Sequence, residues 1–115
     1  MTSVAVLGLG RMGSAMAARL ADLHDVRTWT RSGSGSPAAS VRGADVVLLC
    51  LYDGPACRDV LAAVLPALSA RATVVNTTTV GPDEAEALDA LVATTGAAYL
   101  HAPVMGRAPP SPRAG

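Results

Sequence analysis

The sequence predicts an α/β fold in which helices cover both faces of a doubly wound parallel sheet. Two observations support this fold class. Apolar segments with strand character alternate along the chain with segments of helical periodicity, and short connections join them. The segment at residues 45–52 (DVVLLCLY) is almost purely apolar, which is typical of a strand buried on both faces of a parallel sheet. A chain of 115 residues has room for one such domain.

The first strand is expected at residues 3–7, and three glycines follow it in G-x-G-x-x-G spacing. Gly8 allows a tight turn out of the strand, Gly10 allows the backbone to approach a diphosphate, and Gly13 allows the next helix to lie close to the sheet. That helix is expected at residues 12–20, so its unpaired N–H groups face the turn. Glycines also take this spacing by chance, but between a strand and a helix they predict a Rossmann-like dinucleotide-binding turn.

The remaining elements follow from the same periodicities. Further strands are expected at residues 25–30, 45–52, 72–76 and 97–100. The expected helices are a short turn at 37–42, a helix at 56–65, and a helix that Pro82 opens and Gly96 ends. Residues 1–106 thus form one domain, and residues 107–115 (RAPPSPRAG), with three prolines, are predicted to be a disordered tail.

The composition excludes several function classes. Nine arginines balance nine acidic residues and are scattered along the chain, so neither nucleic acid nor a membrane is indicated as a partner. The spacing of Cys50 and Cys57 matches no metal or redox motif, and no metal site is expected. No apolar run approaches the roughly twenty residues that cross a bilayer, and the first one breaks at Gly8 instead of forming a signal sequence. We therefore expect a cytoplasmic protein.

Four segments match one family in order. They are GLGRMGSAMAARL from Gly8, TRS from Thr30, ADVVLLCLYDGPACRDVL from Ala44, and VVNTTTVGPDEAEAL through APVMG, ending at Gly106. Together they resemble the β-hydroxyacid dehydrogenases, which include 3-hydroxyisobutyrate and 6-phosphogluconate dehydrogenases and to which imine reductases are related. The resemblance implies a truncated amino-terminal part of an NADP(H)-dependent oxidoreductase. The deazaflavin-dependent NADP reductases share the glycine motif and would look similar at this length.

Arg31 is the residue that indicates NADP. NAD-binding folds usually place an acid at the end of the second strand, whereas a guanidinium there can pair with the 2′-phosphate of NADP. A solvated loop arginine is the alternative. Leu51 and Tyr52 follow the third strand, and Thr79 matches the family's threonine near the nicotinamide ribose, although residues 77–79 also fit an ordinary polar turn. The residues expected at the cofactor are Gly8, Leu9, Gly10, Arg11, Met12, Gly13, Thr30, Arg31, Ser32, Leu51, Tyr52 and Thr79.

The substrate segment departs from the family's pattern. Its Asp-Ala-Pro-Val-Ser-Gly-Gly reads His101-Ala102-Pro103-Val104-Met105-Gly106-Arg107 here, and Met105 cannot donate a hydrogen bond as the serine would. The family's hydride transfer would take place between NADP(H) and a small hydroxy acid, carbonyl or imine, and the loss of the serine favours a less polar substrate, as in imine reductases. Arg107 offers a replacement positive charge or lies on a solvated rim. The residues expected at the substrate are Met105, Gly106 and Arg107.

Catalysis by this chain alone is not expected. The resemblance places a proton-donating lysine and a helical domain beyond the matching segments, and the chain contains no lysine. Only twelve residues lie between Arg31 and Ala44, which leaves no room for the family's helix and edge strand. No catalytic residue is assigned. The open hypotheses are an oxidoreductase's cofactor domain, completed by a homodimer or partner chain, a non-enzymatic NADP-binding or regulatory module, and an inactive remnant.

Overall fold

The computed structural model describes residues 2–8, 10–31, 33 and 35–102. Several expectations fall outside these residues: the tail at 107–115, the cofactor residues Leu9 and Ser32, and the substrate residues Met105, Gly106 and Arg107. The side chain of Met12 is also outside the described part. None of the helices that the structure describes is long and apolar enough to cross a membrane.

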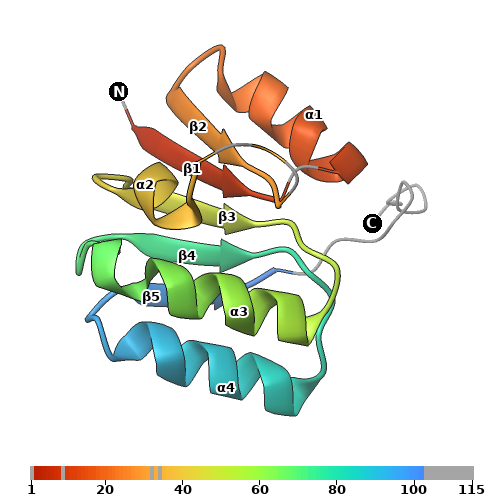
Figure 1. Ribbon diagram of the computed structural model, residues 1–115, viewed down its shortest axis with the longest axis vertical. Coiled ribbons are helices and arrows are strands. Elements are labelled where there is room, and N and C mark those ends of the chain that lie inside the picture. Colours follow the sequence, from red (N-terminus) through yellow and green to blue (C-terminus); the bar gives the residue numbers. More distant parts are fainter. Residues whose placement is uncertain (1, 9, 32, 34, 103–115) are drawn as a thin grey trace, which may run out of the picture.

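Parallel strands alternate with helices along the chain, as Figure 1 shows. In chain order the elements are β1 (Ser3–Leu7), α1 (Gly10–Leu20), β2 (Asp25–Trp29), α2 (Pro37–Val41), β3 (Val46–Leu49), α3 (Gly54–Val64), the 3-10 turn η1 (Leu65–Ala67), β4 (Thr73–Asn76), α4 (Pro82–Ala93) and β5 (Ala98–His101).

The five strands form one sheet in the order β2-β1-β3-β4-β5, and every pair is parallel. Leu7 of β1 pairs with Trp29 on one side and with Leu49 on the other. The register continues from Leu49 to Asn76 and on to His101, so all five strands end at one edge of the sheet. The chain passes from β1 to β2 on one side and then returns past β1 to β3 on the other, so the strand order reverses at β1. Open α/β sheets bind ligands at such a switch point.

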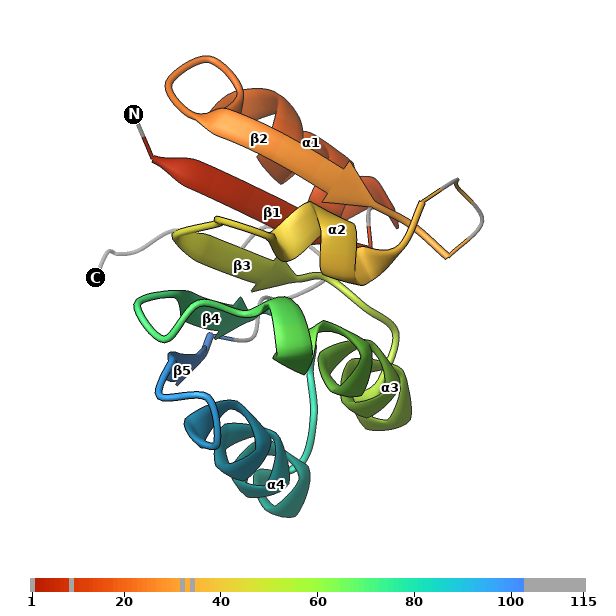
Figure 2. The same ribbon diagram turned by 60° about the vertical axis from the view of Figure 1, so that its left-hand side comes forward.

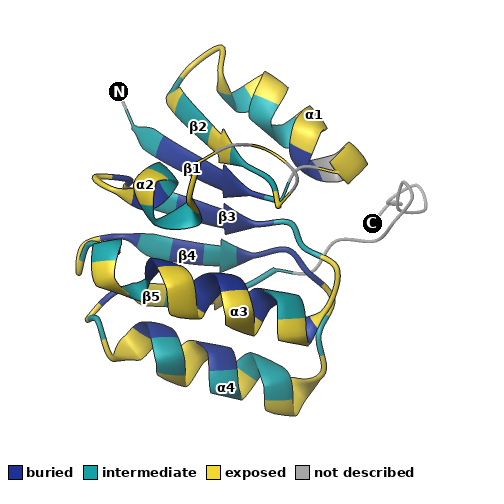
Figure 3. Ribbon diagram, viewed as in Figure 1, coloured by how far each residue is buried: buried dark blue, intermediate teal, exposed yellow. Residues whose placement is uncertain are grey.

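Helices cover both faces of the sheet (Figure 2). Helices α2, α3 and α4 pack on one face, where Val47 and Leu49 are fully buried. Helix α1 packs on the other face, where Met16 lies against the cluster that contains Leu48. Figure 3 shows the buried residues concentrated in the central strands. The predicted doubly wound α/β class is therefore confirmed.

The element boundaries differ from the predicted ones at functionally relevant places. The third strand ends at Leu49, three residues earlier than expected, and α3 begins at Gly54, two residues earlier. Helix α1 also begins two residues early, at Gly10. Residues 33 and 35–45 hold α2 and no strand, so β2 is an edge strand of the described sheet.

Candidate functional site

The turn between β1 and α1 is closely packed at two of its three glycines. Gly8 has a φ of 82°, and its N–H donates to the carbonyl of Trp29 at 2.7 Å. A Cβ at Gly8 would overlap Leu51 Cδ2 and lie 2.7 Å from the carbonyl oxygen of Cys50. A Cβ at Gly13 would lie 2.5 Å from the carbonyl oxygen of Gly8. The packing of β1, β3 and α1 therefore requires glycine at both positions.

Gly10 differs from these two glycines. Its φ is 47°, and apart from its chain neighbours and the adjacent backbone of α1, no heavy atom of the described residues lies within 4 Å of where its Cβ would be. The residue opens α1, whose first turn contains no acidic residue, while the Arg11 side chain is exposed beside it. Unpaired N–H groups and the positive end of the helix dipole lie at this turn. We call this open space the Gly10 cradle; a helix N-terminus beside open space can accept an anionic group such as a diphosphate.

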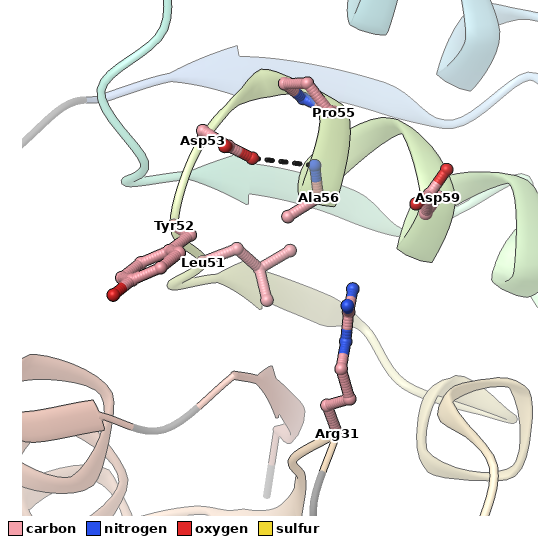
Figure 4. A pocket seen from close by; sticks show the side chains of 7 residues that line it. All are labelled: Arg31, Leu51, Tyr52, Asp53, Pro55, Ala56 and Asp59. Carbon is pink, nitrogen blue, oxygen red and sulfur yellow. Dashed lines mark hydrogen bonds between the residues drawn. The ribbon is translucent and has the colours of Figure 1, made fainter.

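A pocket of about 470 Å³ lies between the end of β2 and the start of α3, and one of its lining residues, Leu51, packs against Gly8 of this turn. It is lined by Arg31, Leu51, Tyr52, Asp53, Pro55, Ala56 and Asp59. Figure 4 shows the Arg31 side chain extending from the β2 side toward the wall that α3 forms. The combination of an apolar wall with a few charged groups is typical of a small-molecule site.

Asp53 determines where the α3 wall of the pocket begins. Its Oδ1 accepts a hydrogen bond from the Ala56 N–H at 3.0 Å, which caps the helix (Figure 4). Tyr52, just before it, is 95% exposed. An aromatic ring so exposed beside an apolar pocket is available to cover a flat ligand.

A polar network holds the loops that follow β3 and β4. The Leu51 N–H donates to the Thr78 hydroxyl at 2.9 Å, which ties the two loops together. Asn76 is fully buried; its amide donates to the Tyr99 hydroxyl at 3.0 Å, and its Oδ1 accepts from the Thr78 N–H at 2.9 Å. Buried polar groups with such partners fix a loop in one conformation.

Two thiols and a histidine lie near this network. Burial raises the pKa of the Cys50 and Cys57 thiols, so both stay protonated at neutral pH. The Cys57 thiol lies 3.7 Å from Asn76 Oδ1. His101 Nε2 is 3.4 Å from the Thr78 carbonyl oxygen, at the end of β5.

The structure brings most of the described candidate residues to one edge of the sheet. Arg31, Leu51 and Tyr52 line the pocket. Thr30, which precedes Arg31, is half-buried, and its carbonyl accepts a hydrogen bond from the Gly33 N–H that closes the turn. Thr79 is exposed after β4 and does not line this pocket.

Sequence reasoning missed four residues of the pocket. These are Asp53, Pro55, Ala56 and Asp59. A usable signal was present, because Pro55, Ala56 and Asp59 share one face of a helix that directly follows an apolar strand.

The sequence matches the family described as the NAD binding domain of 6-phosphogluconate dehydrogenase over residues 3–112. The chain belongs to this family. Among curated proteins, it is 33% identical over 124 residues to a probable 3-hydroxyisobutyrate dehydrogenase of Mycobacterium tuberculosis, covering 92% of this chain and 41% of that protein. It is 31% identical over 117 residues to the NADPH-dependent reductive aminase of Aspergillus oryzae, covering 89% of this chain and 39% of that protein.

Solved structures give the same result. The Mycobacterium tuberculosis 3-hydroxyisobutyrate dehydrogenase with L-serine superposes with a TM-score of 0.86 at 31% identity, over 92% of this chain and 41% of that one. The Aspergillus terreus reductive aminase in complex with NADPH and ethyl levulinate gives 0.77 at 30% identity, over 88% and 40%. This chain thus spans about 40% of the relatives' length and is an NAD(P)-binding domain of the β-hydroxyacid dehydrogenase and imine reductase family.

Proposed function

We propose that the chain binds NADP(H) at the carboxyl edge of its sheet. The diphosphate would lie against the N–H groups at the start of α1, the 2′-phosphate would pair with Arg31, and the adenosine would occupy the adjoining pocket. The observation that carries this proposal is the open space at Gly10 beside a pocket with Arg31 on its wall. A fixed positive charge near a helix N-terminus favours a ligand with several phosphate groups.

Three further observations support NADP over NAD. Arg31 follows β2 at the place where NAD-binding folds usually carry an acid for the ribose hydroxyls. The reductive aminase of Aspergillus oryzae is named as NADPH-dependent. The Aspergillus terreus enzyme has been solved with NADPH.

The wider role that we propose is in an oxidoreductase of this family. Bound NADPH would supply a hydride to a small carbonyl or imine, or the oxidised cofactor would accept one from a hydroxy acid. The residues of this chain would bind and orient the cofactor. Because the chain has no lysine, and a second copy of it would have none either, the acid that protonates the product would come from a partner chain or a further segment.

A non-enzymatic role is the second candidate. The mouse protein named cytokine-like nuclear factor N-PAC is 29% identical over 114 residues, covering 90% of this chain and 21% of that protein. That protein is named as a nuclear factor and not as an oxidoreductase. A domain similar to this chain therefore also occurs in a protein that is not named for an enzymatic activity. The two roles are separated by an activity assay in which a candidate partner and a panel of hydroxy acids, aldehydes and imines are added and the absorbance of reduced nicotinamide is followed. A change in reduced nicotinamide supports the oxidoreductase role, and no change with any substrate supports the non-enzymatic one.

Calorimetric titration of the folded chain with NADPH and NADH tests the cofactor proposal. We expect Arg31→Gln to weaken NADPH about tenfold or more, because charge-assisted hydrogen bonds contribute about 1.5–3 kcal/mol, and to change NADH less than about twofold. Arg71→Gln is the control, since Arg71 is exposed just before β4, at the opposite edge of the sheet. Equal losses for both cofactors in Arg31→Gln would contradict the proposal.

A further inference from the structure

The pocket carries an acidic side chain that phosphate binding does not explain. Asp59 lies on α3, across the pocket from Arg31, and both side chains are exposed to solvent (Figure 4). Leu51, Pro55 and Ala56 form the apolar part of the lining. A carboxylate repels a nearby phosphate and only accepts hydrogen bonds, so the ligand group that Asp59 favours is a hydrogen-bond donor.

The position of Asp59 along α3 restricts what that donor can be. Asp59 is five residues after Gly54, the first residue of α3, which corresponds to about 7.5 Å along the helix axis at 1.5 Å per residue. It shares a helix face with Pro55 and Ala56. A purine lying on this face, with its ribose toward the start of α1, would present its far edge to Asp59. A purine measured from its glycosidic nitrogen to its 6-substituent, together with one hydrogen bond of about 2.9 Å, is comparable to this distance.

The chemistry of the two groups is complementary. An ionised carboxylate only accepts hydrogen bonds. Adenine carries an exocyclic amino group at position 6, which donates, whereas a 6-oxopurine carries an acceptor there. The Arg31 guanidinium can stack on the ring face while Asp59 contacts its edge.

We propose that Asp59 is a specificity-determining residue that accepts a hydrogen bond from the 6-amino group of the cofactor's purine. This inference rests on the proposed function and goes beyond it. The pocket then selects a 6-aminopurine dinucleotide over its 6-oxopurine analogue, because the analogue places a carbonyl oxygen against the carboxylate.

The test compares NADPH with reduced nicotinamide hypoxanthine dinucleotide phosphate by calorimetric titration of the full chain. We expect the wild type to bind NADPH about tenfold more tightly, at the lower end for a charge-assisted hydrogen bond because the pocket is open to water. In Asp59→Asn the preference is expected to fall to about twofold or less, since an amide can donate or accept. Asp22→Asn makes the same charge change in the exposed turn after α1 and should keep the wild-type preference.

Each outcome separates this inference from the proposed function. Equal binding of both dinucleotides by the wild type overturns the role of Asp59 and leaves NADP binding intact. Retained preference in Asp59→Asn overturns it as well. Tighter NADPH binding by Asp59→Asn would show that Asp59 competes for Arg31 instead. Absence of binding of either dinucleotide to the folded wild type contradicts the proposed function itself.

Discussion

Gly10 and Gly43 allow the cradle at α1 to be tested with a matched pair of alanine variants. Both have a positive φ, 47° and 76°, and within the described chain both have open space where a Cβ would be. Gly10 opens α1 at the carboxyl edge of the sheet, whereas Gly43 lies before β3 at the opposite edge. Gly10→Ala and Gly43→Ala therefore introduce similar backbone strain, but only one of them adds a methyl group where the diphosphate is expected.

The expected magnitudes follow from this geometry. A left-handed backbone costs a non-glycine residue about 1–2 kcal/mol, and the reduced entropy of the unfolded chain returns about 0.4–1 kcal/mol. Each variant should lose about 1 kcal/mol of unfolding free energy, which lowers Tm by about 4–8 °C. NADPH binding should weaken at least tenfold in Gly10→Ala, because the methyl group separates the diphosphate from the N–H groups, and less than twofold in Gly43→Ala.

Thermal denaturation gives the stabilities, and calorimetric titration below both Tm values gives the affinities. Equal NADPH affinity in the two variants would refute the assignment of the diphosphate to the Gly10 cradle. A much larger stability loss in Gly10→Ala would refute the view that this space is open in the free protein.

Three further predictions concern the network and the caps around the site. Asn76→Leu should lower the unfolding free energy by about 2–4 kcal/mol in urea denaturation, because it leaves the buried Thr78 N–H unpaired, whereas Thr79→Val at an exposed position should change it by less than about 0.5 kcal/mol. Burial raises the pKa of the Cys57 thiol above its ordinary value of 9.0, so the thiol ionises more readily in the unfolded chain than in the folded one. The folded state therefore keeps its full stability below that pH and loses unfolding free energy as pH rises toward the folded pKa. Urea denaturation across this range should show a smaller loss of unfolding free energy with pH in Cys57→Ser. Asp53→Ala should cost about 1 kcal/mol through loss of the α3 cap, and Asp53→Ser should retain most of it, as thermal denaturation can measure.

Much of the fold was predictable because its signals are local. The glycine spacing after the first apolar segment identified the β1–α1 turn, and the structure provides a steric reason for Gly8 and Gly13. Arg31 was predicted to lie at the cofactor because its place follows from the end of β2, and the structure places it on the wall of the pocket.

Two features were not predictable from local patterns. Residues 50–52 continue the apolar run, yet β3 ends at Leu49. The Cys50 N–H still donates to the Leu7 carbonyl of β1, but the Leu51 N–H donates to the Thr78 hydroxyl instead of to a neighbouring strand. Asp59 reads as a solvated residue on a helix surface. Its place in the pocket depends on α3 lying opposite Arg31, a contact between segments far apart in the sequence.

The central claim is that main-chain N–H groups at the start of α1 hold the cofactor's diphosphate. Amide chemical shifts of the isotope-labelled chain, recorded by NMR during NADPH titration, test it most directly. The largest changes are expected at Gly10, Arg11 and Gly13, with smaller changes at Arg31 and negligible ones at Gly43. Saturable NADPH binding that leaves the amides of the first turn of α1 unshifted would contradict the claim.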